Sequence, residues 1–137
     1  MKRVLFLCTG NAARSQMAEA LANNFHGDAI EAVSAGSRPA GFVHPLAIRA
    51  MAEIGIDISG AESKSAAKFI DQQFDAVVTV CDSAAKDCPH WPGAKRIEHW
   101  PIEDPSFAPD GDAARLFRET RDDLARRIGE LVAAMTG

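Results

Sequence analysis

The chain has 137 residues, of which 47% are hydrophobic and 25% are charged, and its formal net charge is -4. These values are typical of one globular domain, residues 1–137, with a core that needs no disulfide or metal to hold it. The acidic balance disfavours nucleic acid as the main partner, and no apolar stretch is long enough to cross a membrane.

The first predicted element is a buried strand at Val4–Cys8, a continuous apolar run that a turn at Gly10 ends. The run follows two basic residues, as a secretion signal does, but it is too short for one. We therefore expect a cytoplasmic protein, in which cysteines stay mostly reduced. The odd number of cysteines, three, also argues against a disulfide framework.

The rest of the chain alternates predicted helices and strands. In chain order these are a helix at Ala12–Phe25, a strand at Ile30–Ala35, a helix at Pro45–Ile54, a shorter helix at Ser63–Phe69, strands at Ala76–Cys81 and Arg96–His99, and an amphipathic helix at Leu116–Met135. Ser63 is the expected N-cap of the shorter helix, and Gly55 the expected C-cap of the helix before it. The alternation predicts an α/β fold: a single three-layer domain with a four-stranded parallel sheet flanked by helices.

Ligands of such sheets bind at the carboxyl ends of the strands. Cys8 and Cys81 each end a predicted strand. Both side chains are therefore expected at the same edge of the sheet, which is where we expect the chemistry.

A candidate oxyanion-binding loop follows the first strand and comprises Cys8, Thr9, Gly10, Asn11, Ala12, Ala13, Arg14 and Ser15. Its glycine and small alanines allow successive N–H groups to turn inward, and the positive end of the next helix adds to the field. Arg14 can hold two oxygens of a tetrahedral anion such as phosphate or arsenate. The same field favours a thiolate at Cys8, which predicts a nucleophile.

Two neighbours are expected to support this sulfur. Ser15 can hydrogen-bond to it, and Asn11 can brace the loop through its amide while adopting a positive φ. The alternative is a buried cysteine followed by an ordinary glycine turn, because short Cys-x5-Arg patterns recur by chance. The strand before the loop and the helix after it favour the functional interpretation.

Two further cysteines, Cys81 and Cys88, lie in the segment TVCDSAAKDCPHWPG. In a continuous helix their Cα atoms would be about 10.5 Å apart, whereas a disulfide needs roughly 4.4–6.8 Å, so they could pair only if the segment bends. A metal site with His90 or His99 is disfavoured, because the spacing matches no common zinc pattern. From the residues alone, a redox pair and two incidental cysteines remain equally good interpretations.

Asp104 precedes a proline in a predicted loop, within HWPIEDPSF. An aspartate before proline is most often a turn residue, and that is the simpler interpretation. As a general acid it would protonate a departing oxygen, with Glu103 as the nearest rival for that role. Asp82, beside Cys81, fits structural capping better.

These motifs resemble the low-molecular-weight protein tyrosine phosphatase superfamily, which carries Cys-x5-Arg-Ser near its N-terminus after the first strand. The stretch CTGNAARSQMAEA is similar to the arsenate reductase branch of that superfamily. So are VSAGSRP, HPLAIRAMAEIGIDISG, FDAVVTVCD, VCDSAAKDCP, HWPIEDP and FRETRDDL, and the resemblance therefore covers nearly the whole chain.

The resemblance implies reduction of arsenate to arsenite by a cysteine thiol relay without a cofactor. Cys8 would attack arsenate while Asp104 protonates the leaving oxygen. Cys81 would then form a disulfide with Cys8, and Cys88 would convert it to a Cys81–Cys88 disulfide. Thioredoxin or a similar dithiol donor would reduce that bond, and phosphate or sulfate would compete with arsenate. We expect a monomer.

Some proteins of that branch bind potassium beside the loop, at positions that match Asn11, Glu19 and Ser34, and complete the site with an acidic residue where this chain has Lys64. An ammonium group would occupy that place, so we expect no potassium site and no other metal site.

The runner-up function is a phosphatase, which needs only Cys8, Arg14 and Asp104. It is disfavoured because the chain has no tyrosine at all, whereas such phosphatases usually carry a tyrosine pair after the acid. A third possibility is a non-catalytic anion sensor or redox-regulated binding module.

Overall fold

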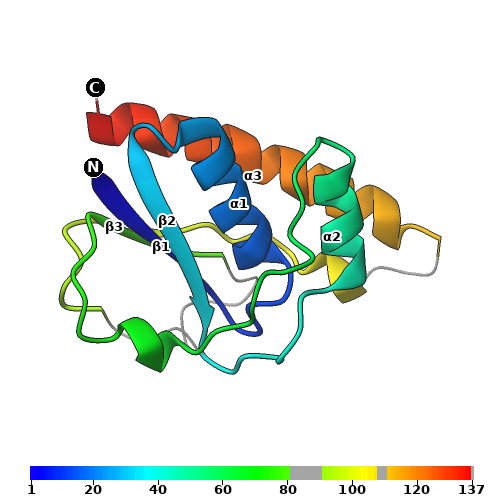
Figure 1. Cartoon of the computed structure of the whole chain (residues 1–137), viewed down its shortest axis with the longest axis horizontal. Coiled ribbons are helices and arrows are strands. Elements are labelled where there is room, and N and C mark those ends of the chain that lie inside the picture. The colour runs from blue at the N-terminus through cyan, green and yellow to red at the C-terminus, as the bar shows by residue number, and fades with distance from the viewer. Residues whose placement is uncertain (81–90, 108–110, 137) are drawn as a thin grey trace.

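The computed structural model describes residues 1–80, 91–107 and 111–136, and Figure 1 shows how their helices and strands are arranged. In chain order the elements are β1 (Lys2–Cys8), α1 (Arg14–His26), β2 (Ile30–Gly36), α2 (Pro45–Ala52), the 3-10 helix η1 (Ala66–Phe69), β3 (Ala76–Thr79), β4 (Ile97–His99), the 3-10 helix η3 (Pro105–Phe107) and α3 (Ala113–Thr136). The four strands form one parallel sheet in the order β2-β1-β3-β4. This confirms the predicted α/β fold.

The register brings the carboxyl ends of the strands to one edge of the sheet. Cys8, the last residue of β1, pairs with Gly36 at the end of β2. One residue earlier, Leu7 pairs with Thr79 at the end of β3, which in turn pairs with His99 of β4. Since β1 is flanked by strands on both sides, Cys8 leaves the sheet at the middle of this edge.

The two faces of the sheet are covered differently. The three α-helices pack on the face that carries Val4, Phe6 and Cys8, where they form the larger core. The opposite face carries Leu5 and Leu7 and is covered by the single turn of η1 and its neighbouring segments. Figure 1 shows α1, α2 and α3 grouped together, with η1 lying apart from them as a short turn coloured green.

Two helix boundaries differ from the prediction in ways that matter for the site. α1 begins at Arg14 rather than at Ala12, so the arginine is the first residue of the helix. The N-cap of η1 is Ser65, whose Oγ accepts the N–H of Ala67, and the prediction of Ser63 was wrong. Ser63 instead donates its hydroxyl to the carbonyl of Gly10, a contact between residues far apart in the sequence.

The remaining boundaries shift by small amounts. α2 ends at Ala52 with Glu53 as its C-cap, so the prediction that Gly55 is the C-cap was wrong. Gly55, with φ of 81°, lies in the turn that follows the helix. β3 ends at Thr79, and Cys81 lies outside the described residues. None of the described helices has an apolar stretch of the length that a membrane span requires.

Candidate functional site

The backbone carbonyls of the oxyanion loop are turned outward, toward the segment after β2. Cys8 O accepts the N–H of Ser37 at 3.2 Å, Thr9 O that of Arg38 at 2.9 Å, Gly10 O that of Ala40 at 2.8 Å, and Ala12 O that of His44 at 2.8 Å. In a trans peptide the N–H points opposite to the C=O. The loop therefore directs N–H groups toward its own centre, a geometry that suits an anion.

The start of α1 adds to this receptor. Its N-cap is Ala13, which has no side chain that could cap the first N–H groups, and the first turn of the helix holds no acidic residue. Uncapped N–H groups and the helix dipole both favour a bound anion at such an end. The small residue at the cap thus leaves these donors available to a ligand.

The sulfur of Cys8 lies at the base of the loop, and the residue is 2% exposed. It is 2.8 Å from the hydroxyl oxygen of Ser15 and accepts the backbone N–H of Asn11 at 3.2 Å. Asn11 reaches this position with φ of 49°, the positive value expected from the sequence. These contacts hold the sulfur at the base of the loop, where a nucleophile would have to lie to reach a bound anion.

Gly36 allows the end of β2 to approach the loop. A Cβ atom at this position would lie 2.5 Å from the carbonyl oxygen of Thr9 and 3.0 Å from the backbone nitrogen of Asn11. Those contacts are with backbone, which cannot move aside easily. Any side chain here would therefore displace the loop.

The side chain of Asn11 braces the loop from behind. Its Nδ2 donates to Ser15 Oγ at 2.8 Å and to Ser34 Oγ at 3.0 Å, and its Oδ1 accepts the N–H of Lys64 at 2.7 Å and Nε2 of Gln16 at 2.9 Å. The brace by Asn11 was predicted, but the contributions of Gln16 and Ser63 were missed. In the sequence, the only indication for Gln16 was its place directly after the Arg-Ser pair. In the structure its side chain is buried.

Arg14 and Asp104 meet across the opening of the loop. Arg14, 6% exposed, donates Nη1 to the carbonyl oxygen of Ile102 at 2.8 Å, and its Nη2 lies 3.5 Å from Asp104 Oδ2. The other oxygen of Asp104 accepts the N–H and the hydroxyl of Ser106, at 2.9 and 2.7 Å. Asp104 is thereby fixed beside the loop, whereas its rival Glu103 is exposed.

The structure therefore brings together three of the predicted catalytic residues: Cys8, Arg14 and Asp104. The eight residues of the predicted oxyanion loop run from the last residue of β1 to the first two residues of α1. The other two predicted catalytic residues, Cys81 and Cys88, lie outside the described residues. Within the described part of the chain, no three His, Cys, Asp or Glu side chains gather in a way that could hold a metal ion.

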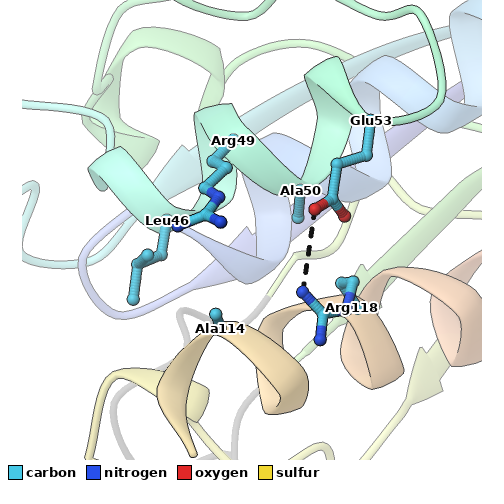
Figure 2. A pocket seen from close by; sticks show the side chains of 6 residues that line it. All are labelled: Leu46, Arg49, Ala50, Glu53, Ala114 and Arg118. Carbon is cyan, nitrogen blue, oxygen red and sulfur yellow. Dashed lines mark ion pairs between the residues drawn. The ribbon is translucent and has the colours of Figure 1, made fainter. Parts of the chain in front are cut away.

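Two hollows elsewhere on the described surface lack such chemistry. Figure 2 shows one between α2 and α3, lined by Leu46, Arg49, Ala50, Glu53, Ala114 and Arg118 and crossed by an ion pair of 3.6 Å between Arg118 and Glu53. The other, of about 560 Å³, lies between β4 and α3 and is lined mainly by arginine and glutamate side chains. Neither has a nucleophile, so the oxyanion loop is the candidate active site.

Comparison with known proteins shows the family to which the chain belongs. The family model described as "Low molecular weight phosphotyrosine protein phosphatase" matches residues 3–136. The chain is 43% identical to an arsenate reductase of Halalkalibacterium halodurans over 93% of this chain and 92% of that protein. It is 36% identical to a glutaredoxin arsenate reductase of Synechocystis over 99% of this chain and 100% of that protein.

Solved structures agree as well. An arsenate reductase in the phosphate binding state superposes with a TM-score of 0.86 at 36% identity, covering 99% of this chain and 100% of that chain. A thioredoxin-dependent arsenate reductase of Corynebacterium glutamicum superposes with a TM-score of 0.77 at 32% identity, covering 98% of this chain and 62% of that chain. The comparisons thus show both the family and the fold.

Proposed function

The chain belongs to the low molecular weight phosphotyrosine protein phosphatase family, and from this premise we propose that it reduces arsenate to arsenite. The observation that carries the proposal is the buried sulfur of Cys8, which lies within an anion-binding loop and contacts Ser15 Oγ and the N–H of Asn11. The names of the similar proteins support arsenate as the anion. Phosphate and sulfate, which share its tetrahedral shape, are expected to compete.

The first step joins Cys8 to the substrate. The thiolate attacks arsenic, an As–O bond breaks, and Asp104 donates a proton to the oxygen that leaves as water. Arg14 holds two of the remaining oxygens. Asp104 lies next to this arginine, with its Oδ2 3.5 Å from Arg14 Nη2, and is therefore close to the oxygens that Arg14 would hold.

The second step is the reduction. Cys81 attacks the sulfur of Cys8, an S–S bond forms, and the electron pair of the breaking S–As bond stays on arsenic, which leaves as arsenite. Cys88 then attacks Cys81, which frees Cys8 and leaves a Cys81–Cys88 disulfide. Each exchange requires a thiolate and an accessible sulfur. The two electrons come from two thiols, so no cofactor is needed.

An external dithiol must reduce this last disulfide. Similar proteins are named for glutaredoxin or for thioredoxin, so a small dithiol protein or glutathione-linked donor is the expected partner. Cys8 has to be a free thiol at the start of each cycle, which requires a reducing compartment. We therefore propose that the enzyme works in the cytoplasm. Because one chain carries all the proposed catalytic residues, we also propose that it works as a monomer.

The test follows arsenate-dependent NADPH oxidation, once with thioredoxin and thioredoxin reductase and once with glutaredoxin, glutathione and glutathione reductase. We expect steady turnover with one of the two systems and none for Cys8→Ser. Cys88→Ser should release one arsenite per enzyme and then stop. Full steady-state turnover of Cys88→Ser would remove Cys88 from the relay.

Hydrolysis of phosphate monoesters is the second candidate function, and the description of the family favours it. It needs Cys8, Arg14 and Asp104 but neither of the other cysteines. Cys81→Ser separates the two functions: it should abolish multiple-turnover arsenate reduction while leaving any hydrolysis of para-nitrophenyl phosphate intact. A wild-type protein that hydrolyses this ester efficiently but does not reduce arsenate would overturn the proposal.

A further inference from the structure

An ion pair lies behind the oxyanion loop, on the side away from the anion. Lys64 Nζ is 3.5 Å from Glu19 Oε1 and donates to the carbonyl oxygen of Glu62 at 3.1 Å. The two side chains are only 15% and 21% exposed. The same oxygen of Glu19 accepts the hydroxyl of Ser34 at 3.1 Å. An ionised carboxylate can only accept hydrogen bonds, so the hydroxyl of Ser34 donates its one hydrogen to Glu19. From its other neighbour, on the side of the loop, Ser34 can therefore only accept a hydrogen bond.

This other neighbour of Ser34 is the side-chain amide of Asn11, whose orientation is fixed. Its Oδ1 faces two donors, the backbone N–H of Lys64 and Nε2 of Gln16. Its Nδ2 therefore carries the two hydrogens that go to Ser34 and Ser15. With Asn11 donating to it, the Ser15 hydroxyl has its own hydrogen left for the sulfur of Cys8 at 2.8 Å.

We propose that Lys64 is a positioning residue that keeps the charge behind this hydrogen-bond chain balanced, while the chain itself ends with a donor on Cys8. The inference rests on the role of Cys8 as the nucleophile in the proposed function. The carboxylate of Glu19 makes Ser34 donate away from the loop. The ammonium of Lys64 neutralises the negative charge of Glu19, which would otherwise oppose a thiolate at Cys8.

The charges around Cys8 are then balanced in two pairs. Arg14 and Asp104 pair at 3.5 Å on the side of the loop where the anion binds, and Lys64 and Glu19 pair at 3.5 Å on the other side. Removing Lys64 alone leaves the negative charge of Glu19 without its partner, in a half-buried position behind the loop. Removing both Lys64 and Glu19 removes that charge as well. The two residues should therefore show coupling in a double-mutant cycle.

The test measures the rate of Cys8 alkylation by iodoacetamide against pH, in a Cys81→Ser/Cys88→Ser background where Cys8 is the only cysteine. Lys64→Met should move the midpoint of this profile to higher pH and slow alkylation at pH 7 by about threefold to tenfold, which corresponds to roughly half to one pH unit. Lys64→Arg, which keeps the charge, should stay close to the parent. Glu19→Gln/Lys64→Met should lie closer to the parent than Lys64→Met does.

Either of two results overturns the inference: a Lys64→Met profile identical to that of the parent, or a Lys64→Arg profile displaced as far as that of Lys64→Met. The second would mean that packing rather than charge matters. Thermal unfolding of each variant checks that its fold is intact. The alkylation assay contains no arsenate, so it tests the inference separately from the proposed function. Arsenate reduction with an unmoved profile refutes the inference alone, and a displaced profile without arsenate reduction refutes the proposed function alone.

Discussion

The two faces of the sheet differ in thickness, although alternate residues of the same strand supply both. Phe6 and Cys8 of β1 face the layer formed by α1, α2 and α3, where α3 alone has 24 residues. Leu5 and Leu7 face the four-residue η1 and the loops beside it. The helical layer is built from long elements that pack on one another, whereas the thin layer depends on a few aromatic contacts.

This difference separates the proposed anion-binding loop from the proposed redox cysteines. Cys8 belongs to the thick core, so the proposed anion-binding loop starts from the helical face. Trp91, the first described residue after Cys81 and Cys88, belongs to the thin core, where its ring packs 5.9 Å from that of Phe74. Regions with few buried apolar contacts open at lower free energy than the main core. Movement that accompanies thiol exchange should therefore disturb the thin face first.

A matched pair of truncations gives the largest expected effect. Phe117→Ala on the helical face should lower the free energy of unfolding by about 4 kcal/mol, because Phe117 is fully buried among long helices that cannot close the cavity. Phe74→Ala on the other face should cost about 3 kcal/mol, since a thin cover can relax into the space. Urea unfolding measures both, and an equal or larger loss for Phe74→Ala would contradict the comparison.

The two tryptophans report the two faces separately. Trp91 lies in the thin core and donates Nε1 to the carbonyl oxygen of Gln72, while Trp100 lies in the helical core beside Phe6. We expect oxidation by arsenate to change the fluorescence of Trp100→Phe, in which Trp91 remains, because Cys88 is three residues from Trp91. Trp91→Phe, in which Trp100 remains, should change little. The reverse pattern would place the redox-linked change on the helical face.

The sequence predicted the parts of this molecule that depend on local pattern. Alternating apolar runs and helical spacing were enough for the order of the elements and for a parallel sheet. The loop from Cys8 to Ser15 was also predictable, because its nucleophile, glycine and arginine are close together in the chain. Asp104 was different: a turn residue was the simpler interpretation, and the resemblance to a family was needed to favour the acid.

The contacts that were missed are long-range. Ser63 was expected to cap a helix, but it contacts Gly10, 53 residues away. Ser63 and Ser65 are both serines just before η1, so local sequence allows either of them to be its N-cap. Ser65 is the N-cap, while Ser63 contacts the oxyanion loop instead. Gln16 likewise reaches the carbonyl oxygen of Glu62, which no local pattern indicates. Bracing of an active-site loop is decided by tertiary packing, which the sequence pattern alone does not reveal.

The smallest expected effect concerns a contact between Asp75 and Arg3 at the amino ends of the strands, far from the site. Asp75, just before β3, accepts the backbone N–H of Arg3 at 2.8 Å, and the guanidinium of Arg3 lies 4.7 Å from the centre of the Phe74 ring. The N–H of Arg3, helped by Lys95, lowers the pKa of Asp75. A lowered folded-state pKa stabilises the fold above the unfolded value, about 3.9, and this stabilisation is lost as the pH falls through the folded value.

Asp75→Asn should therefore lower the free energy of unfolding by about 1 kcal/mol at pH 7, since the amide still accepts the N–H of Arg3 but without charge. The difference from the wild type should be smaller at pH 3, below the unfolded value of about 3.9, than at pH 7. Urea unfolding at the two pH values measures it, and Asp71→Asn, at an exposed neighbouring aspartate, is the control. Arsenate reduction should be unchanged, because Asp75 and Cys8 are at opposite ends of the sheet. A stability loss that is the same at both pH values would show that the charge of Asp75 does not stabilise the thin face.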